Sequence, residues 1–249
     1  MFDGLAELLG KRLRLIAFDT PGFGQSDPIP ADCTIDDLAR GFWEALDEIG
    51  VGRCHVYGLH SGNKIATAMA VHSGQRVANL ALAGQSHSLI PDRLTRNATI
   101  VARRGGDAIA SADRDRLALG EWAAAFQRIS ALWHDPIVYG DGAIEPRLGQ
   151  IRARVADELH DPASSAALYR ANFAYDLAQQ AALVLVRTLI VEIATPEEDR
   201  TIGRQGERLA KRMQNAEVAV VEAPQAHSVT LERQAEQLAH VLLDFFEAV

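Results

Sequence analysis

Hydrophobic and polar residues follow two different periods along the chain, and each period predicts one kind of element. Short apolar runs bounded by turn-forming residues predict buried strands, and apolar positions three or four residues apart predict amphipathic helices. The predicted strands cover residues 13–18, 54–57, 77–83, 188–193 and 219–222. The predicted helices cover residues 1–10, 34–49, 64–70, 202–214 and 231–246. Strands that alternate with helices in this way indicate an α/β domain.

A clear helix signal begins at Thr34. This residue stands where an N-cap is expected, because Asp36 and Asp37 follow in the first turn. Apolar side chains then recur at helical spacing at Leu38, Phe42, Leu46 and Ile49. We expect these four side chains to form the buried face of a helix.

Composition narrows the classes of protein to which the chain can belong. Its 249 residues, of which 48% are hydrophobic, suffice for one large α/β domain with a lid, which we prefer to two small domains. The net charge of −8 argues against a nucleic-acid partner, because a phosphate backbone requires a basic surface. No apolar run approaches the length of a membrane span, and no leader opens the chain. We therefore expect a cytoplasmic protein that contacts no membrane.

Cysteine and glycine spacings indicate neither a metal site nor a nucleotide site. Cys33 and Cys54 lie far apart and outside any CxxC or metal-type spacing, so we expect free thiols in a reducing compartment. No HExxH or Walker pattern occurs, and no predicted strand is followed by GxGxxG. We expect no metal and no cofactor.

The stretch from Val56 to Lys64 predicts a strand, a sharp turn and a helix. Gly58 and Gly62 flank the turn, where we expect glycine to be needed so that strand and helix can approach. Such a turn lifts one side chain above the sheet at the positive end of a helix. Backbone N–H groups there can meet a developing negative charge.

This stretch resembles the nucleophile elbow of the α/β-hydrolase superfamily, GxSxG between a strand and a helix. On that pattern Gly58 and Gly62 are the two glycines, and the nucleophile position falls on His60. Ser61 comes one residue too late. The resemblance implies a mostly parallel sheet flanked by helices, with a helical cap over the active site.

A second segment, Asp19 to Asp27, resembles the D-x-P-G-x-G-x-S-D loop that follows the fourth strand of many α/β-hydrolases, including esterases, epoxide hydrolases and carbon-carbon bond hydrolases. We include Gly22 and Phe23 of this loop among the candidate substrate-binding residues. By this alignment the N-terminal strands are absent, and one of them is central in the family's sheet. A start downstream of the true one is the explanation that we favour. Direct pairing of the two flanking strands, or a second chain that fills the gap in a homodimer, are the alternatives.

The resemblance implies a core of residues 1–89 and 183–249 and a helical cap insertion of residues 90–182. Within the insertion Trp122, Phe126, Ile129 and Trp133 fall on one helical face. We expect Trp122 and Trp133 to line the substrate pocket, although packing of cap on core explains the same pattern. Ser86, after the strand 77–83, is a further pocket candidate or a capped turn.

The last two predicted strands are followed by candidates for the remaining catalytic groups. In the family the acid follows the first of these strands, where Asp199 matches best and Glu198 is the fallback. His227 follows the final strand in a small-residue loop and matches the catalytic histidine. The order elbow, acid, histidine is the order that α/β-hydrolases use.

Three interpretations of the chemistry remain open. In the first, the chain hydrolyses a small hydrophobic ester or related acyl substrate, with His60 as nucleophile or as a base beside His227 and Asp199. In the second, Ser61 is the nucleophile. In the third, His60 serves a cofactor-free lyase or isomerase, or the pocket binds a small ligand without hydrolysis. We favour the first, because a pure binding pocket has no obvious use for Asp199 and His227.

Overall fold

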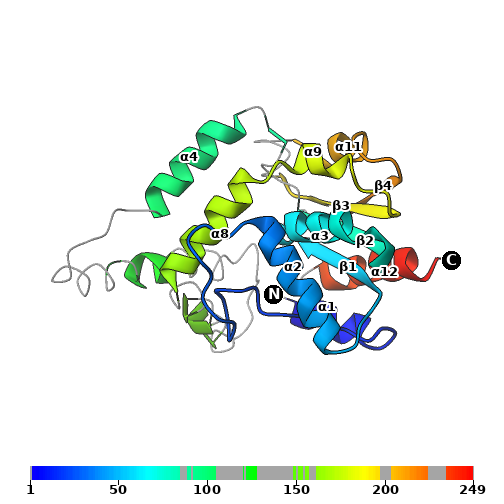
Figure 1. The fold of residues 1–249 in the computed structure, drawn as a ribbon, viewed down its shortest axis with the longest axis horizontal. Helices are drawn as coiled ribbons and strands as arrows, with labels where there is room; N and C mark the ends of the chain where they lie inside the picture. Colours follow the sequence, from blue (N-terminus) through cyan, green and yellow to red (C-terminus); the bar gives the residue numbers. More distant parts are fainter. Residues whose placement is uncertain are drawn as a thin grey trace. The chain divides into compact units, whose positions relative to one another are not determined.

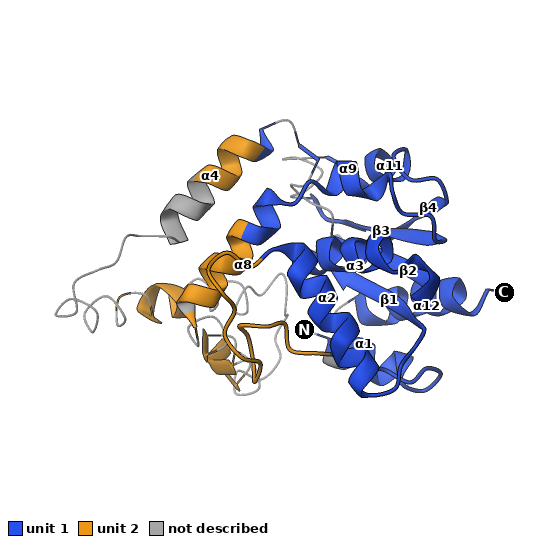
Figure 2. Cartoon of the chain, in the orientation of Figure 1, with its two compact units in different colours: residues 1–17, 34–93, 171–249 blue, residues 18–33, 94–170 orange. Residues whose placement is uncertain are grey.

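The computed structural model describes most of the chain. It covers residues 2–84, 89–90, 92–104, 120, 122–127, 148–149, 151–153, 155–156, 161–196, 203–223 and 234–248. The chain forms two compact units, shown in blue and orange in Figure 2. The first comprises residues 1–17, 34–93 and 171–249, and the second comprises residues 18–33 and 94–170. The insertion boundaries implied by the sequence, 90–182, remain a prediction.

A parallel four-stranded sheet forms the centre of the first unit (Figure 1). Its strands are β1 (Cys54–Leu59), β2 (Val77–Ala83), β3 (Thr188–Ala194) and β4 (Ala216–Glu222), and they lie in that order. Each neighbouring pair is parallel. Four of the five predicted strands are therefore confirmed, and the sheet buries nearly all of β2 and β3.

The predicted strand at residues 13–18 is wrong. The structure assigns these residues to no strand, and Leu15 and Phe18 are largely exposed. They therefore do not pair with β1, and direct pairing of these two predicted strands is not observed among the described residues. An extended segment needs a neighbouring strand to bond its N–H and C=O groups, and among the described residues this segment has none.

Helices cover both faces of the sheet. On one face α1 (Asp3–Leu9) and α12 (Ala235–Glu247) contact each other and bury a cluster with the strands. Its members alternate along the strands, as a pleated sheet requires. They include Leu5, Leu9, Ala81, Ala83, Leu189, Val191, Leu238 and Leu242.

The other face carries α2 (Ile35–Glu48), α3 (Ser61–His72), α9 (Leu177–Ala181) and α11 (Gly206–Ala210). The sequence predicted α11 as residues 202–214, but the helix is shorter at both ends. The model also contains the 3-10 turn η1 (Gly74–Arg76), α4 (Arg93–Arg104) and α8 (Pro162–Ala174). None of the described helices is both long and apolar enough to cross a bilayer.

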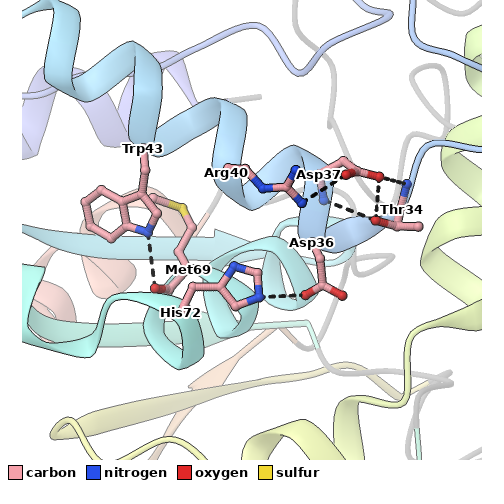
Figure 3. A network of polar contacts seen from close by, with 7 residues as sticks. All are labelled: Thr34, Asp36, Asp37, Arg40, Trp43, Met69 and His72. Carbon is pink, nitrogen blue, oxygen red and sulfur yellow. Dashed lines mark hydrogen bonds and ion pairs between the residues drawn. The ribbon is translucent and has the colours of Figure 1, made fainter.

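Polar contacts at its start and along its length fix α2 (Figure 3). Thr34 is the N-cap as predicted, and with Asp37 it forms a capping box. The hydrogen bonds with Thr34 lower the pKa of Asp37. Asp36 pairs with His72 of α3 at 3.0 Å. The buried face of α2 includes Leu38 and Leu46 as expected. Trp43 is also buried, while Phe42 is only half-buried and Ile49 is exposed.

Candidate active site

The turn between β1 and α3 holds His60 in a strained conformation. His60 has φ 51° and ψ −112°, and it is the only residue other than glycine with a positive φ in the part of the chain that the structure describes. Backbone hydrogen bonds fix it on both sides: His60 N donates to Ala83 O at 3.0 Å, and Asn63 N donates to His60 O at 3.1 Å. Strain of this kind costs about 1–3 kcal/mol and persists only where the surroundings impose it.

Gly58 explains how strand and helix approach each other so closely. A Cβ atom at Gly58 would lie 2.3 Å from Gly62 O and 2.9 Å from Ala66 Cβ. The predicted need for glycine at position 58 is therefore confirmed. At Gly62 it is not, because a Cβ there would meet nothing within 4 Å and the residue has no positive φ.

The imidazole of His60 lies against Gly84, the residue that follows β2. A Cβ atom at Gly84 would be 2.8 Å from both Nδ1 and Cε1 of His60. Gly84 itself has φ +65°, so a side chain there would be strained as well as crowded. One edge of the imidazole ring thus packs against the backbone at the carboxyl end of β2. Sequence reasoning missed this partner, although its place just after a predicted strand could have indicated it.

Ser61 begins α3 and is half-buried. The first N–H groups of a helix have no intrahelical partner and carry partial positive charge. The N–H groups of Ser61 and Gly62 therefore lie beside His60, where negative charge on a reacting carbonyl oxygen would be stabilised.

Two buried polar residues follow the elbow on α3. Asn63 is 1% exposed and Lys64 is 6% exposed. Lys64 Nζ donates to the main-chain oxygen of Asn172, near the end of α8, so the lysine joins the elbow helix to the segment that returns to the sheet. Sequence reasoning treated both as ordinary helix positions. The mostly apolar run that follows them to Ala70 could have indicated that both side chains are buried.

Titratable groups on β1 are kept neutral by burial. Burial raises the pKa of the Tyr57 hydroxyl and that of the Cys54 thiol, with a smaller opposing effect of Arg76 on Cys54. Burial and the nearby Arg53 lower the pKa of His55. A thiol with a raised pKa is a poor nucleophile at neutral pH, which leaves the elbow as the reactive end of this strand.

The segment that carries the predicted acid is fixed at both ends. Asp199 and Glu198 lie outside the described residues, but Thr195 before them is 1% exposed. Gly206, which comes after them at the start of α11, donates a hydrogen bond from its N–H group to the buried carboxylate of Glu192 on β3. His227, Ser86 and Trp133 also lie outside the described residues. Their approach to His60 stays a prediction.

The other candidate binding residues belong to the second unit. Gly22 has φ +87°, and a Cβ there would be 2.5 Å from Ser164 Cβ. Phe23 is half-buried. Trp122 is 50% exposed and stacks on Phe126 with ring centroids 5.3 Å apart. Their role in substrate binding stays a prediction.

No group of three or more histidine, cysteine or acidic side chains among the described residues could hold a metal ion. Cys33 and Cys54 form no disulfide bond with each other.

Comparison with known proteins places the chain in a family. Residues 1–241 match the model of the alpha/beta hydrolase family. A 2-hydroxy-6-oxononadienedioate/2-hydroxy-6-oxononatrienedioate hydrolase of Burkholderia vietnamiensis is 40% identical over 72 residues, which are 28% of this chain and 25% of that protein. The chain thus spans about a quarter of the length of the curated relatives that it matches.

Solved structures match over nearly the whole chain. A hydrolase from Pseudomonas aeruginosa has a TM-score of 0.71 and 24% identity, with 100% of this chain and 85% of that one covered. The enol-lactonase from Burkholderia xenovorans has a TM-score of 0.69 and 20% identity, with 98% and 85% covered. At these identities the likeness shows the fold. Together with the family match and the strand, strained turn and helix at His60, it shows that the chain belongs to the alpha/beta hydrolase family.

Proposed function

We propose that this chain hydrolyses a small hydrophobic ester or related acyl compound and that His60 takes the place of the elbow nucleophile. The observation that carries the proposal is the strained backbone of His60 between two fixed hydrogen bonds. Strained non-glycine residues cluster at active sites and ligand clamps, where the surrounding structure imposes the strain. The matched proteins, named as a hydrolase of a dienedioate and an enol-lactonase, support a hydrolytic reaction.

In the proposed reaction an unprotonated ring nitrogen of His60 attacks the carbonyl carbon of the ester. The N–H groups at the start of α3 stabilise the oxyanion. The C–O bond then breaks, the alcohol leaves with the proton that the other ring nitrogen of His60 carried, and a neutral acyl-imidazole remains. Water hydrolyses this intermediate and restores the neutral ring. His227, oriented by Asp199, is proposed to take the proton from that water.

A panel of p-nitrophenyl esters tests the proposal. We expect His60→Ala and His227→Ala to lower kcat/KM by about 100-fold or more, the usual contribution of such a group. Ser61→Ala should stay within about twofold of the wild type. Exposed imidazoles also cleave these esters slowly, so His240→Ala, which removes a 78% exposed ring on α12, is the matched control and should change nothing.

Two further measurements separate this proposal from its alternatives. Acid-quenched mass spectrometry should find the acyl group on the peptide that contains His60. His60→Ser should retain esterase activity, because it places a hydroxyl at the same point of the elbow. Loss of activity with Ser61→Ala, or an acyl group on Ser61, would transfer the role to the serine. Tight binding of small ligands without turnover by any variant would indicate a binding protein or an enzyme of another class.

A further inference from the structure

One cavity is lined only by residues of the first unit, and no residue of the elbow (residues 56–64) is among them. Its volume is about 540 Å³, within the range of small-molecule sites. Ala178 and Gln179 of its lining lie on α9, Arg93 is the first residue of α4, and Arg212 comes two residues after the end of α11 (Figure 1). Its lining comprises Leu89, Arg93, Asp176, Ala178, Gln179, Ala182 and Arg212.

Among its described lining residues, the cavity has more positively charged than negatively charged side chains. Arg93 pairs with Asp176 at 3.3 Å, and the second carboxylate oxygen of Asp176 accepts a hydrogen bond from Gln179 N at 3.1 Å. Arg212 is exposed, and its guanidinium forms no ion pair with any acid among the described residues. Among the described lining residues, two cations and one paired carboxylate make the charge positive, on a protein whose net charge is −8.

We propose that this cavity binds a small organic carboxylate between Arg93 and Arg212. A guanidinium presents a planar pair of N–H donors that matches a carboxylate, and Arg212 has this pair available. Leu89, Ala178 and Ala182 provide apolar surface for a short hydrocarbon body. The Arg93–Asp176 pair stays in place, because Arg93 retains further donors. The site is independent of the hydrolysis proposed at His60.

Titration of the full chain with butanoate tests the site by NMR. We expect saturable binding with a Kd of about 1 mM, which corresponds to about 4 kcal/mol. The shifted amides should include those of Ala178, Gln179 and Ala182. Butyramide, which has the same body without the charge, should bind at least tenfold more weakly.

Two variants on the same part of the chain make the test specific. Arg212→Gln should weaken butanoate binding about tenfold or more, since it removes the available guanidinium. Arg208→Gln, which removes an exposed arginine of α11 outside the cavity lining, is the matched control and should stay within twofold. Arg212→Lys should fall between them, because it keeps the charge but loses the planar fork.

Four results would overturn the proposal. They are equal binding by the two glutamine variants, equal binding of butyramide, shifts confined to residues outside the lining, or no saturable binding at all. Circular dichroism of each variant confirms that it is folded before the titration is compared.

Discussion

Two turns of this chain place residues at positive φ by different means. In the loop Asp19–Asp27 both positive φ angles fall on glycines, Gly22 and Gly24. At the elbow the positive φ falls on His60, and the glycines lie around it instead, at Gly58 and Gly84. The loop forms its turn with little steric strain, because glycine has no Cβ atom. The elbow retains backbone strain at one residue other than glycine, His60.

The two turns also differ in what fixes them. Asp19 organises its own loop: its carboxylate accepts a hydrogen bond from Gln25 N at 3.0 Å, and its main-chain oxygen accepts one from Ser26 Oγ at 2.7 Å. The elbow is fixed from outside, by β2 and by the backbone of α3. Local hydrogen bonds suffice for a turn of glycines, but a strained histidine needs tertiary contacts on both sides.

The largest expected effect is that of Gly58→Ala. The new Cβ would meet the backbone of Gly62, which cannot rotate away as a side chain can. We expect a loss of about 3 kcal/mol in the free energy of unfolding, measured by urea denaturation. Gly41→Ala in α2 is the control, since a Cβ there meets nothing within 4 Å, and it should gain about 1 kcal/mol. Equal stability of the two variants would refute a tertiary origin for the elbow.

Gly24→Ala should cost about 2 kcal/mol, from left-handed strain together with one displaced hydrogen bond. The new Cβ would be 2.3 Å from the carboxyl group of Asp19, which can move but then releases Gln25 N. Because the clash is with one side chain, the double variant with Asp19→Ala should cost less than the sum of the single variants in urea denaturation. Strict additivity would show that Asp19 does not organise the loop.

His60 should reverse the usual order of alanine and glycine. Both His60→Ala and His60→Gly remove the imidazole, but only glycine adopts φ 51° without strain. We expect His60→Gly to be about 1 kcal/mol more stable than His60→Ala in thermal and urea unfolding. Ala45→Gly in α2 should instead lose about 1 kcal/mol, the ordinary effect within a helix. If alanine is the more stable at position 60 too, the elbow carries no strain.

The smallest effect expected is that of Ser26→Ala. Removal of the hydrogen bond to Asp19 O should cost about 0.5–1 kcal/mol of unfolding free energy. Ser61→Ala is the comparison at the elbow, and it should change stability by less than about 0.5 kcal/mol. A larger loss at Ser61 than at Ser26 would mean that the elbow depends on its serine hydroxyl rather than on backbone contacts.

Much of the architecture could be predicted from the sequence. The helical spacing after Thr34 and the apolar runs at 77–83 and 188–193 depend on local pattern, and the structure has elements at all three places. The elbow was predicted from Gly58 and from its place between strand and helix. The place of His60 followed from the same spacing, because a turn of this type fixes which residue lies at its tip.

Several features could not be predicted from local pattern. The seat of the His60 ring on Gly84 joins residues 24 apart in the sequence. The burial of Lys64 depends on the end of α8, more than a hundred residues away. The cavity at Arg93 and Arg212 brings together residues more than a hundred positions apart in the sequence. No periodicity records such pairs, because each is formed only when the chain has folded.

The sequence by itself therefore determined the helices, the apolar character of the strands and the position of the elbow. Tertiary structure decided which apolar runs became strands and how the elbow is strained. The physical reason lies in the backbone hydrogen bonds. A helix such as α2 satisfies its N–H and C=O groups within itself, whereas a strand needs a neighbour, which β1 to β4 have and residues 13–18 lack in the described structure.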